Sequence, residues 1–388
     1  MSEAMARPAH LCFVSTTIYP VLVDTNVAVV GGAEVQQAMI ARALRARGHR
    51  VSVLTRDHGV PDQVTAEGIE VHHTPPTAGR GIKGLRRIHP RLTDVVNGLR
   101  RIDPDLVYFR CASGMLAACA WYARWAQKRL VYAAAHDYDF LPGRIFGLER
   151  RELLLYRAGL RWCDFVVVQN REQQALLRRR FGREGLIVPN CYAESNVVAG
   201  DPAGPVLWVG TVKPLKRPEL FLALAARFPQ RRFVLVGGPA GDGDGAAAYY
   251  RRIEMQARQL ANVEFVGFVP FTRVGRHYDG AAVLVNTSEA EGFPNTFLQA
   301  WIRSVPTLSF VAPTTSGEPT GTIACRDVEH MAGLLGALLG NDARWGEASA
   351  RASAHFQRTH SVEAVDSLYD TLLAAPKPSG RFGMVTTP

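Results

Sequence analysis

The sequence predicts an α/β protein made of two halves, each built on its own parallel sheet. Short apolar runs alternate with amphipathic helical stretches through most of the 388 residues, and this alternation is typical of parallel strands with helices on both faces. The length suits two domains of about 100–200 residues each. Near the midpoint, residues 191–204 lose all periodicity and contain Gly200, Pro202 and Gly204, which predicts a linker.

Each half has its own series of predicted elements. In the first half, strands are predicted at 11–15, 50–54, 69–73, 106–110, 129–134 and 165–168, with helices at roughly 33–47, 82–101, 114–127, 144–161 and 171–181. The second half has strands at 206–209, 232–238, 281–285 and 306–310, a helix after Pro218, and further helices at about 327–340, 342–359 and 361–374. Ligands of parallel sheets bind beyond the C-terminal ends of the strands. The loops that follow strands are therefore the candidate site.

These elements define the expected domain organisation. We expect an N-terminal domain over 1–190, a linker over 191–204 and a C-terminal domain over 205–360, then a helix over 361–376 and a disordered tail over 377–388. No apolar run approaches the ~20 residues that span a bilayer. The start, Met1 to His10, is polar, which indicates a cytoplasmic protein rather than a secreted one.

Cysteine and histidine usage argues against disulfide and metal classes. The six cysteines form no C-x-x-C pair, so buried free thiols are expected. No histidine or cysteine cluster has the spacing of metal ligands. We therefore expect no bound metal.

The positive charge is unevenly placed. Residues 1–190 carry 27 lysines and arginines against 17 acidic residues, whereas residues 191–388 carry 18 of each. This asymmetry predicts that the first half meets something anionic, such as a phospholipid surface, a lipid-diphosphate acceptor or an acidic glycan. A solvated basic face is the alternative, and no nucleic-acid partner is expected. The helix at 144–161 sets leucines beside five arginines, so either membrane contact or packing on the sheet fits it.

The segment from Val283 to Trp301 predicts a strand, a turn and a helix that bind a ligand. Pro294 suits a first helical turn, so the backbone N–H groups of Asn295, Thr296 and Phe297 would have no partner within the helix. Such a helix end attracts phosphate, and Gly292 lets a ligand approach closely. Glu291 would repel phosphate but hydrogen-bond sugar hydroxyls. An ordinary strand-to-helix crossover is the alternative.

Glu291-Gly-Phe-Pro-Asn-Thr-Phe-Leu-Gln299 resembles the donor-binding E-x7-E motif of glycosyltransferase family 4. The resemblance implies the GT-B fold, with two Rossmann-like domains whose parallel sheets face a central cleft and a last helix that crosses back to the first domain. Gln299 stands where the family has a second Glu that holds the nucleotide ribose. An amide still bonds hydroxyl groups but carries no charge.

Further segments extend the resemblance along the chain. Gly31-Gly32-Ala33-Glu34 is similar to the family's G-G-x-E stretch, which implies that Gly31, Gly32 and Glu34 lie near the donor diphosphate or the acceptor. In the loop after Gly210 the family uses an Arg and a Lys to hold the diphosphate. Lys216 matches the Lys, whereas Thr211 replaces the Arg. Lys213 or Arg217 is a candidate substitute, since the loop has three cations in reach of the developing charge.

Two other segments also match. His136-Asp137 follows a strand and resembles family segments that place an imidazole at the cleft, so His136 would orient the donor sugar or the acceptor and Asp137 would face the acceptor. A hydrogen-bonded loop residue is the alternative for this histidine. The stretch Val263 to Val269, which includes Phe268, resembles the family segment that contacts the nucleotide base.

The resemblance implies a retaining, metal-independent transfer of a sugar from a nucleoside-diphosphate sugar to an acceptor hydroxyl. The expected catalytic residues are Glu291, Lys216 and His136, and Gly292, Phe293, Asn295 and Thr296 join the donor site. The acceptor would be a glycan or a lipid-linked compound of cell-surface polysaccharide or glycolipid synthesis, reached from the cytoplasm or its membrane face. No cofactor beyond the donor is expected. A sugar-nucleotide epimerase, or a non-catalytic carbohydrate-binding homologue indicated by Gln299 and Thr211, remains open.

Overall fold

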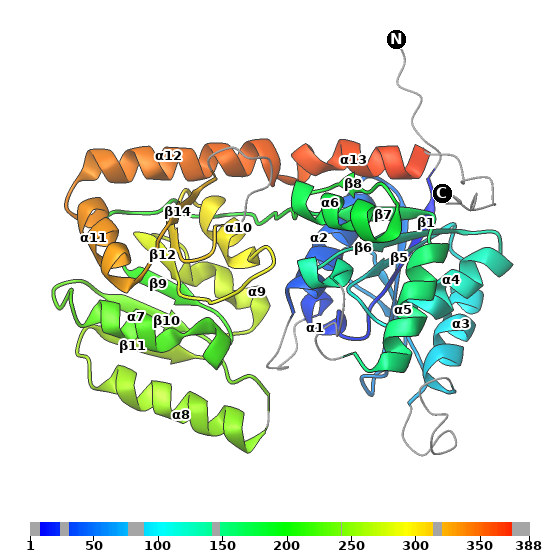
Figure 1. Cartoon of the computed structure of the whole chain (residues 1–388), viewed down its shortest axis with the longest axis horizontal. Coiled ribbons are helices and arrows are strands. Elements are labelled where there is room, and N and C mark those ends of the chain that lie inside the picture. The colour runs from blue at the N-terminus through cyan, green and yellow to red at the C-terminus, as the bar shows by residue number, and fades with distance from the viewer. Residues whose placement is uncertain are drawn as a thin grey trace, which may run out of the picture.

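A computed structural model describes residues 8–23, 31–76, 89–141, 148–241, 243–312 and 320–374. The chain forms two α/β units side by side, each around its own sheet (Figure 1). The predicted fold class is therefore confirmed. The predicted tail over 377–388 lies outside the described residues.

The N-terminal unit contains an eight-stranded sheet in the order β3-β4-β2-β1-β5-β6-β7-β8. Its strands are β1 (His10–Val14), β2 (Arg50–Thr55), β3 (Gln63–Val64), β4 (Glu70–His73), β5 (Leu106–Arg110), β6 (Arg129–Ala133), β7 (Phe165–Val168) and β8 (Leu186–Ile187). All neighbouring pairs are parallel except β3 with β4. Its helices are α1 (Tyr19–Leu22), α2 (Gly32–Ala46), α3 (Arg91–Ile102), α4 (Met115–Trp125), α5 (Arg150–Trp162) and α6 (Arg171–Phe181).

Helices cover both faces of this sheet because its strands are apolar on both sides. Alternate residues of β1 enter different cores: Leu11 and Phe13 pack with α2, whereas Cys12 and Val14 pack with α3 and α4. Side chains alternate between faces along a strand, and a sheet buried on both faces reads as a continuous apolar run. This explains why β1 reads in the sequence as a continuous run of apolar residues and not as alternating apolar and polar residues.

The C-terminal unit contains a fully parallel six-stranded sheet in the order β11-β10-β9-β12-β13-β14. Its strands are β9 (Val206–Val209), β10 (Phe233–Val236), β11 (Val263–Gly267), β12 (Val283–Asn286), β13 (Thr307–Ser309) and β14 (Thr322–Ala324). Its helices are α7 (Pro218–Ala225), α8 (Asp244–Arg258), α9 (Phe271–Val274), α10 (Asn295–Trp301), α11 (Val328–Leu339) and α12 (Asp342–Thr359). The predicted bounds of α12 match those observed.

The last helix, α13 (Val362–Ala374), packs on the N-terminal unit. Its Val365, Tyr369 and Leu372 belong to the core that also contains Leu11 and Phe13. Arg129 of β6 donates a 2.7 Å hydrogen bond to the carbonyl of Leu373. Figure 1 shows α12 and α13 nearly in line across both units, so the chain end ties the second unit to the first.

The strand order of each sheet reverses direction once around a central strand. In the first sheet β1 lies between β2 and β5, and in the second β9 lies between β10 and β12. The loops after the central strand and after one of its neighbours run to opposite sides of the sheet. A crevice therefore opens between them at the C-terminal ends of the strands. The fold therefore provides two crevices, one beyond β1 and β5 and one beyond β9 and β12.

The contact between α4 and α5 depends on a glycine. A Cβ atom on Gly159 would lie 2.7 Å from the carbonyl carbon of Leu116 and 2.8 Å from the nitrogen of Ala117. Because both neighbours are backbone atoms, Gly159→Ala should force the helices apart and lower the free energy of unfolding by about 3 kcal/mol. Chemical denaturation measures this change.

Gly333 provides a matched control for that substitution. It also lies within a helix, α11, but a Cβ there would meet no atom within 4 Å. Gly333→Ala should therefore stabilise the protein by about 0.5–1 kcal/mol, because alanine loses less backbone entropy in a helix. Equal effects of the two substitutions would contradict the close α4–α5 packing.

Candidate active site

A cavity of about 400 Å³ lies between the two units, at the crevice beyond β9 and β12. Most of the donor-site residues expected from the sequence line it: Gly31, Gly32, Thr211, Lys213, Lys216, Phe268, Glu291, Phe293, Asn295, Thr296 and Gln299. Gly237 and Gly238, which directly follow β10, also line it. The fold thus brings together segments that are far apart in the sequence.

Glu291 is held in place by three neighbours. Lys216 pairs with its Oε1, the hydroxyl of Ser288 donates to the same oxygen at 2.6 Å, and Asn286 Nδ2 lies 3.4 Å away. The carboxylate is only 12% exposed and the lysine 20%. This partly buried pair presents one negative and one positive group to the cavity.

The loop that carries Lys216 is tied to the loop after β12. Thr287 donates from Oγ1 to the carbonyl of Lys216 at 2.7 Å. Arg217, in the left-handed region with a φ of 45°, donates from Nε to the carbonyl of Thr287 at 2.9 Å. These bonds fix the position of the Lys216 backbone relative to the loop that carries Glu291.

The two candidate substitutes for the family's arginine occupy different environments. The guanidinium of Arg217 donates to backbone carbonyls and lies over the ring of Phe310, 5.1 Å from its centroid; Arg217 is not among the residues that line the cavity. Lys213 does line the cavity and forms no ion pair with any described residue. Lys213 is therefore the better placed of the two cations.

Gln299 lines the cavity with its amide already hydrogen-bonded. Its side chain is buried at 3% exposure. Its Oε1 accepts from the hydroxyl of Tyr278 at 3.0 Å, and its Nε2 donates to that of Tyr192 at 3.4 Å. A neutral amide suits this position because it can accept from one tyrosine while donating to the other.

The helix after Glu291 begins one residue later than predicted. α10 starts at Asn295, with Pro294 as its N-cap. The expectation that the N–H of Phe297 has no partner is wrong, because this group donates to the carbonyl of Pro294 at 3.1 Å. A tight first turn formed by the proline carbonyl explains the difference.

Asn295 connects the two units. Its Nδ2 donates to the carbonyl of Gly32 at 2.8 Å, and its Oδ1 accepts from Nε2 of Gln36 at 2.9 Å. Gln36 is fully buried and also exchanges two hydrogen bonds with the backbone of Cys191, at 2.8 and 2.9 Å. Gln36 was not singled out from the sequence, because its position within α2 gives no signal of these distant partners.

His136 lies next to Gly292, and neither residue is among those that line the cavity. A Cβ on Gly292 would be 3.0 Å from the carbonyl oxygen of Ala135 and 3.5 Å from Cδ2 of His136. The ring stacks on Tyr138 with a centroid separation of 4.3 Å, and its Nδ1 accepts from the Tyr138 N–H at 3.2 Å. The approach to Gly292 brings this imidazole close to the Glu291 loop.

The turn after His136 is stabilised by a buried carboxyl group. Asp139, in the 3₁₀ helix η1 (Asp137–Phe140), accepts from the N–H of Ala135 and from the hydroxyl of Tyr132, both at 2.8 Å. Burial raises the pKa of Asp139. Asp137, by contrast, accepts from Gln173 of α6 at 2.9 Å and lines neither this cavity nor the next one.

A second cavity, of about 440 Å³, lies at the crevice beyond β1 and β5. Glu34 lines it and accepts from Oγ1 of Thr17 at 2.6 Å. Buried Arg110 also lines it and donates to Oδ1 of Asn190 at 2.7 Å. Cys111 lies beside them in the left-handed region, with a φ of 77°. Glu34, in the Gly31-Gly32-Ala33-Glu34 stretch, was the sequence signal for this cavity.

A buried histidine supports the loop that carries Phe293. His360 is fully buried and donates from Nδ1 to the carbonyl oxygen of Asn190 at 2.7 Å, and its ring centroid lies 4.8 Å from that of Phe293. Since a carbonyl oxygen only accepts, Nδ1 must carry the proton. Burial lowers the pKa of His360 from 6.5 to about 3.

This shift predicts a pH-dependent stability. The unfolded chain binds the His360 proton below pH 6.5, whereas the folded chain binds it only below about 3. The free energy of unfolding should therefore fall as the pH drops through this window, by up to about 1.4 kcal/mol per pH unit. Denaturant titrations across the window should show a weaker dependence in His360→Gln than in the natural chain. A His89→Gln control, at an exposed histidine, should keep the original dependence; identical profiles for all three would contradict the role of His360.

The described residues contain no group of His, Cys, Asp or Glu side chains that could hold a metal ion. Nor does any helix in the described ranges combine the length and apolarity needed to cross a membrane.

Two facing Rossmann-like units with a cavity between them define the GT-B class of proteins. A glycosyl transferase 4-like domain model matches residues 31–192, and a glycosyl transferases group 1 model matches residues 204–341. The chain belongs to glycosyltransferase family 4.

The chain also resembles known glycosyltransferases in sequence. The chain is 31% identical over 178 residues to D-inositol 3-phosphate glycosyltransferase of Mycolicibacterium paratuberculosis, in a match that covers 44% of this chain and 39% of that protein. A second such enzyme, of Catenulispora acidiphila, is 28% identical over 193 residues, 46% of this chain and 45% of that protein. The chain thus matches less than half the length of these relatives.

The similar solved structures show the fold alone. Sucrose-phosphate synthase from Thermosynechococcus elongatus superimposes with a TM-score of 0.73 at 19% identity, covering 95% of this chain and 100% of that one. Anabaena HepE in complex with UDP-glucose gives a TM-score of 0.68 at 17% identity, covering 95% and 100%.

Proposed function

We propose that this chain is a retaining glycosyltransferase that moves a sugar from a nucleoside-diphosphate sugar to an acceptor hydroxyl without a metal ion. The observation that carries the proposal is the partly buried Lys216–Glu291 pair at the crevice beyond β9 and β12, with Lys213 lining the same cavity. Two cations and one carboxylate suit a ligand that joins a diphosphate to a sugar.

The reaction would depend on stabilising the leaving diphosphate. As the bond between the anomeric carbon and the phosphate oxygen breaks, negative charge develops on that oxygen. Lys216 and Lys213 would stabilise this charge in place of a divalent cation, and fixed charges in a partly desolvated site are effective because they need no reorganisation. Glu291 would hold a donor-sugar hydroxyl, and Phe268 at the cavity edge would contact the base.

The acceptor would enter from the N-terminal unit. Its hydroxyl oxygen would bond to the anomeric carbon on the face that the diphosphate leaves, and its proton would pass to the departing phosphate oxygen, which gives retention of configuration. His136 lies close to Gly292 and would orient the reacting groups. Glu34 in the second cavity would bind acceptor hydroxyls. Asp137, which directly follows His136, would face the acceptor.

The acceptor is proposed to be a glycan or a lipid-linked compound of cell-surface polysaccharide or glycolipid synthesis. A lipid-linked acceptor would place the protein at the cytoplasmic face of a membrane, in peripheral contact through its basic N-terminal unit. The protein would need no cofactor besides the donor.

The first test is a thermal-shift series with UDP, GDP and ADP and their sugars, because a ligand that binds the folded state raises the melting temperature. The nucleotide sugar that binds should then release nucleoside diphosphate only when acceptor is added, and the rate should be unchanged by EDTA. Proton NMR of the product should show the donor's anomeric configuration. An epimerised donor in the absence of acceptor would instead identify an isomerase.

A further inference from the structure

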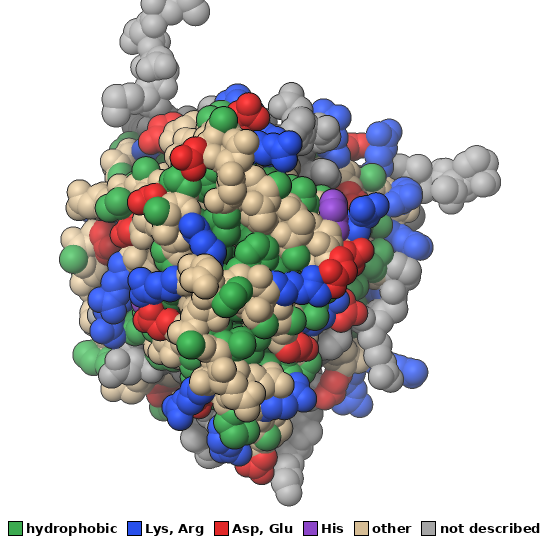
Figure 2. All heavy atoms as spheres, turned by 90° about the vertical axis from the view of Figure 1, so that its left-hand side faces the viewer, with side chains coloured by type: hydrophobic (Ala, Val, Ile, Leu, Met, Phe, Trp, Pro, Cys, Tyr) green, Lys and Arg blue, Asp and Glu red, His purple; other side chains and the backbone are tan. Residues whose placement is uncertain are grey.

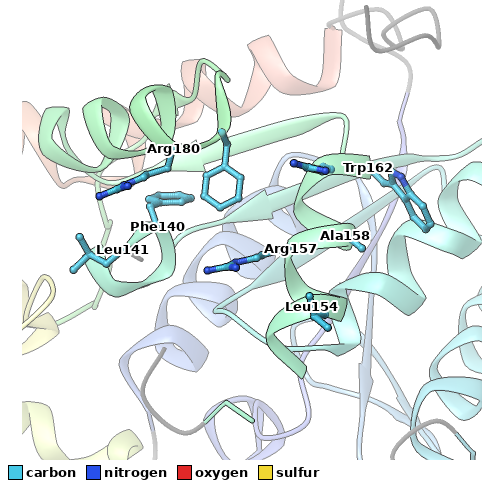
Figure 3. A pocket seen from close by; sticks show the side chains of 9 residues that line it. Phe140, Leu141, Leu154, Arg157, Ala158, Trp162 and Arg180 are labelled. Atoms are coloured by element: carbon cyan, nitrogen blue, oxygen red, sulfur yellow. The ribbon is translucent and has the colours of Figure 1, made fainter. Parts of the chain in front are cut away.

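A basic groove of about 600 Å³ lies on the N-terminal unit between η1, α5 and α6. Its apolar lining comes from Phe140, Leu141, Ala158 and Phe181, and Leu154 and Trp162 also border it. Figure 3 shows Arg180 alongside Phe140, with Arg157 across from them and Trp162 toward the other end. This surface combines an apolar floor with cations at its margins.

No described acidic side chain neutralises the charge of the groove. Arg157, Arg161 and Arg180 line it, and no carboxylate does. None of the three forms an ion pair with a described residue, whereas nearby Arg178 pairs with Glu184 at 3.2 Å. On the end of the C-terminal unit, by contrast, basic and acidic side chains are interspersed (Figure 2). Three guanidinium groups without an ion-pair partner among the described residues, around an apolar floor, suit an anionic amphiphile.

Exposed tryptophans continue this surface across α4. Trp162 is 43% exposed, and Trp121 and Trp125 are 46% and 57% exposed and stack with a centroid separation of 6.1 Å. Arg124 lies 5.9 Å from the Trp162 ring centroid, which joins the pair on α4 to the groove. Leu154 of α5 is 67% exposed. Exposed tryptophan and leucine next to arginine are typical of a protein surface at a membrane interface.

The structure shows how the basic helix packs. Tyr156 and Leu160 of α5 are buried against the sheet side, so the helix does pack as an ordinary covering helix. Its outward face, however, carries Leu154 and Trp162 between the arginines instead of an all-polar surface. The face that packs on the sheet and the face that carries Leu154 and Trp162 are therefore different faces of one helix.

We propose that this arginine–tryptophan face, formed by the groove and the exposed side of α4, docks the chain on an anionic phospholipid bilayer. The headgroup phosphate would lie among Arg157, Arg161 and Arg180, and the exposed tryptophans and Leu154 would enter the interfacial region. The inference names the surface for the peripheral contact proposed above. Because η1 forms one wall of the groove and directly follows His136, docking would hold the acceptor side of the cleft near the membrane.

Vesicle co-sedimentation with the full chain tests this proposal. The natural chain should bind vesicles of phosphatidylcholine and phosphatidylglycerol, should bind phosphatidylcholine alone far more weakly, and should be released by salt. The triple variant R157Q/R161Q/R180Q should need roughly a hundredfold more anionic lipid for half-binding, since each basic residue near an anionic surface contributes to the attraction. Lipids brominated near the headgroup should quench tryptophan fluorescence of the natural chain, and less so in Trp162→Phe.

The matched control removes the same charge from the other unit. R251Q/R276Q/R344Q changes three exposed arginines of the C-terminal unit and should bind anionic vesicles like the natural chain. Equal losses in both triple variants, or no preference for anionic vesicles, would overturn the proposal. So would a melting temperature raised by inorganic phosphate, or binding to single-stranded RNA, without vesicle binding. Nucleotide binding by each variant, read by thermal shift, keeps a failure of docking separate from a failure of the proposed sugar transfer.

Discussion

Lys216→Met is expected to lower the rate of sugar transfer by about a thousandfold, the upper range for removing one preorganised group that stabilises a developing oxyanion. Lys216 lines the cavity and pairs with Glu291, and methionine keeps the length of the side chain while removing its charge. The loss should appear mainly in kcat, because the charge on the leaving oxygen develops as the bond breaks. Steady-state kinetics with the donor identified by thermal shift measures it.

Lys128 is the matched control for this substitution. Its side chain is also 20% exposed and pairs with an acidic residue, Asp103, at 2.9 Å, but it does not line the cavity. Lys128→Met should leave the transfer rate within about twofold of the original, as expected for a surface ion pair of small energy. A Lys216→Met enzyme that kept more than a tenth of the activity would remove Lys216 from the proposed role.

Glu291→Gln is expected to lower kcat/KM by about a hundredfold. The change keeps the shape of the side chain and its hydrogen bond from Ser288 but removes the charge that binds a sugar hydroxyl and positions Lys216, and a charged hydrogen bond is worth about twice a neutral one. Kinetics at varied donor concentration separate a loss of binding from a loss of turnover.

The double variant K216M/E291Q provides the internal check on this second prediction. The two side chains are in direct contact, and changes at contacting residues are not additive. The double variant should therefore lose less activity than the product of the two single losses. Strict multiplication of the losses would indicate that the two residues act independently, contrary to the shared site. Glu289→Gln, two residues away and outside the cavity lining, is the control for charge loss in this loop.

Elements with a strong local pattern were predictable from the sequence. The bounds of α6, α12, β7 and β9 agree with those predicted, because each is a continuous apolar run or a long helical stretch between clear boundaries. β3, β8 and β14 were missed because strands of two or three residues are too short to show a period.

The missed helix α8 has a different cause. It begins at Asp244, directly after a tract rich in glycine, and buries only Ile253 and Ala257 fully. Glycine-rich segments predict loops, and so narrow an apolar stripe gives little helical signal. The charged residues along the rest of the helix include the i,i+4 pair Glu254–Arg258 at 2.7 Å, and they gave no indication of packing on the sheet.

Some residues of the candidate site were predictable from the sequence and others were not. Glu291 and Lys216 were found by motif, and the fold brings them into contact across 75 positions of the sequence. Arg110 and Gln36 could not be found, because their role depends on neighbours that the topology supplies, Asn190 for one and Asn295 for the other. Local patterns predict which loops carry ligands; they do not predict which buried side chains join those loops.

The amide of Gln36 has a mechanical consequence. Its two hydrogen bonds to Cys191 hold the segment that leaves the first sheet after β8. This segment would act as the hinge if the two units moved apart. Its other bond reaches Asn295 of the C-terminal unit at 2.9 Å. Gln36 therefore contacts both units. If they separated, its hydrogen bond to Asn295 would break, while its two hydrogen bonds to Cys191 would still hold the segment that follows the first sheet.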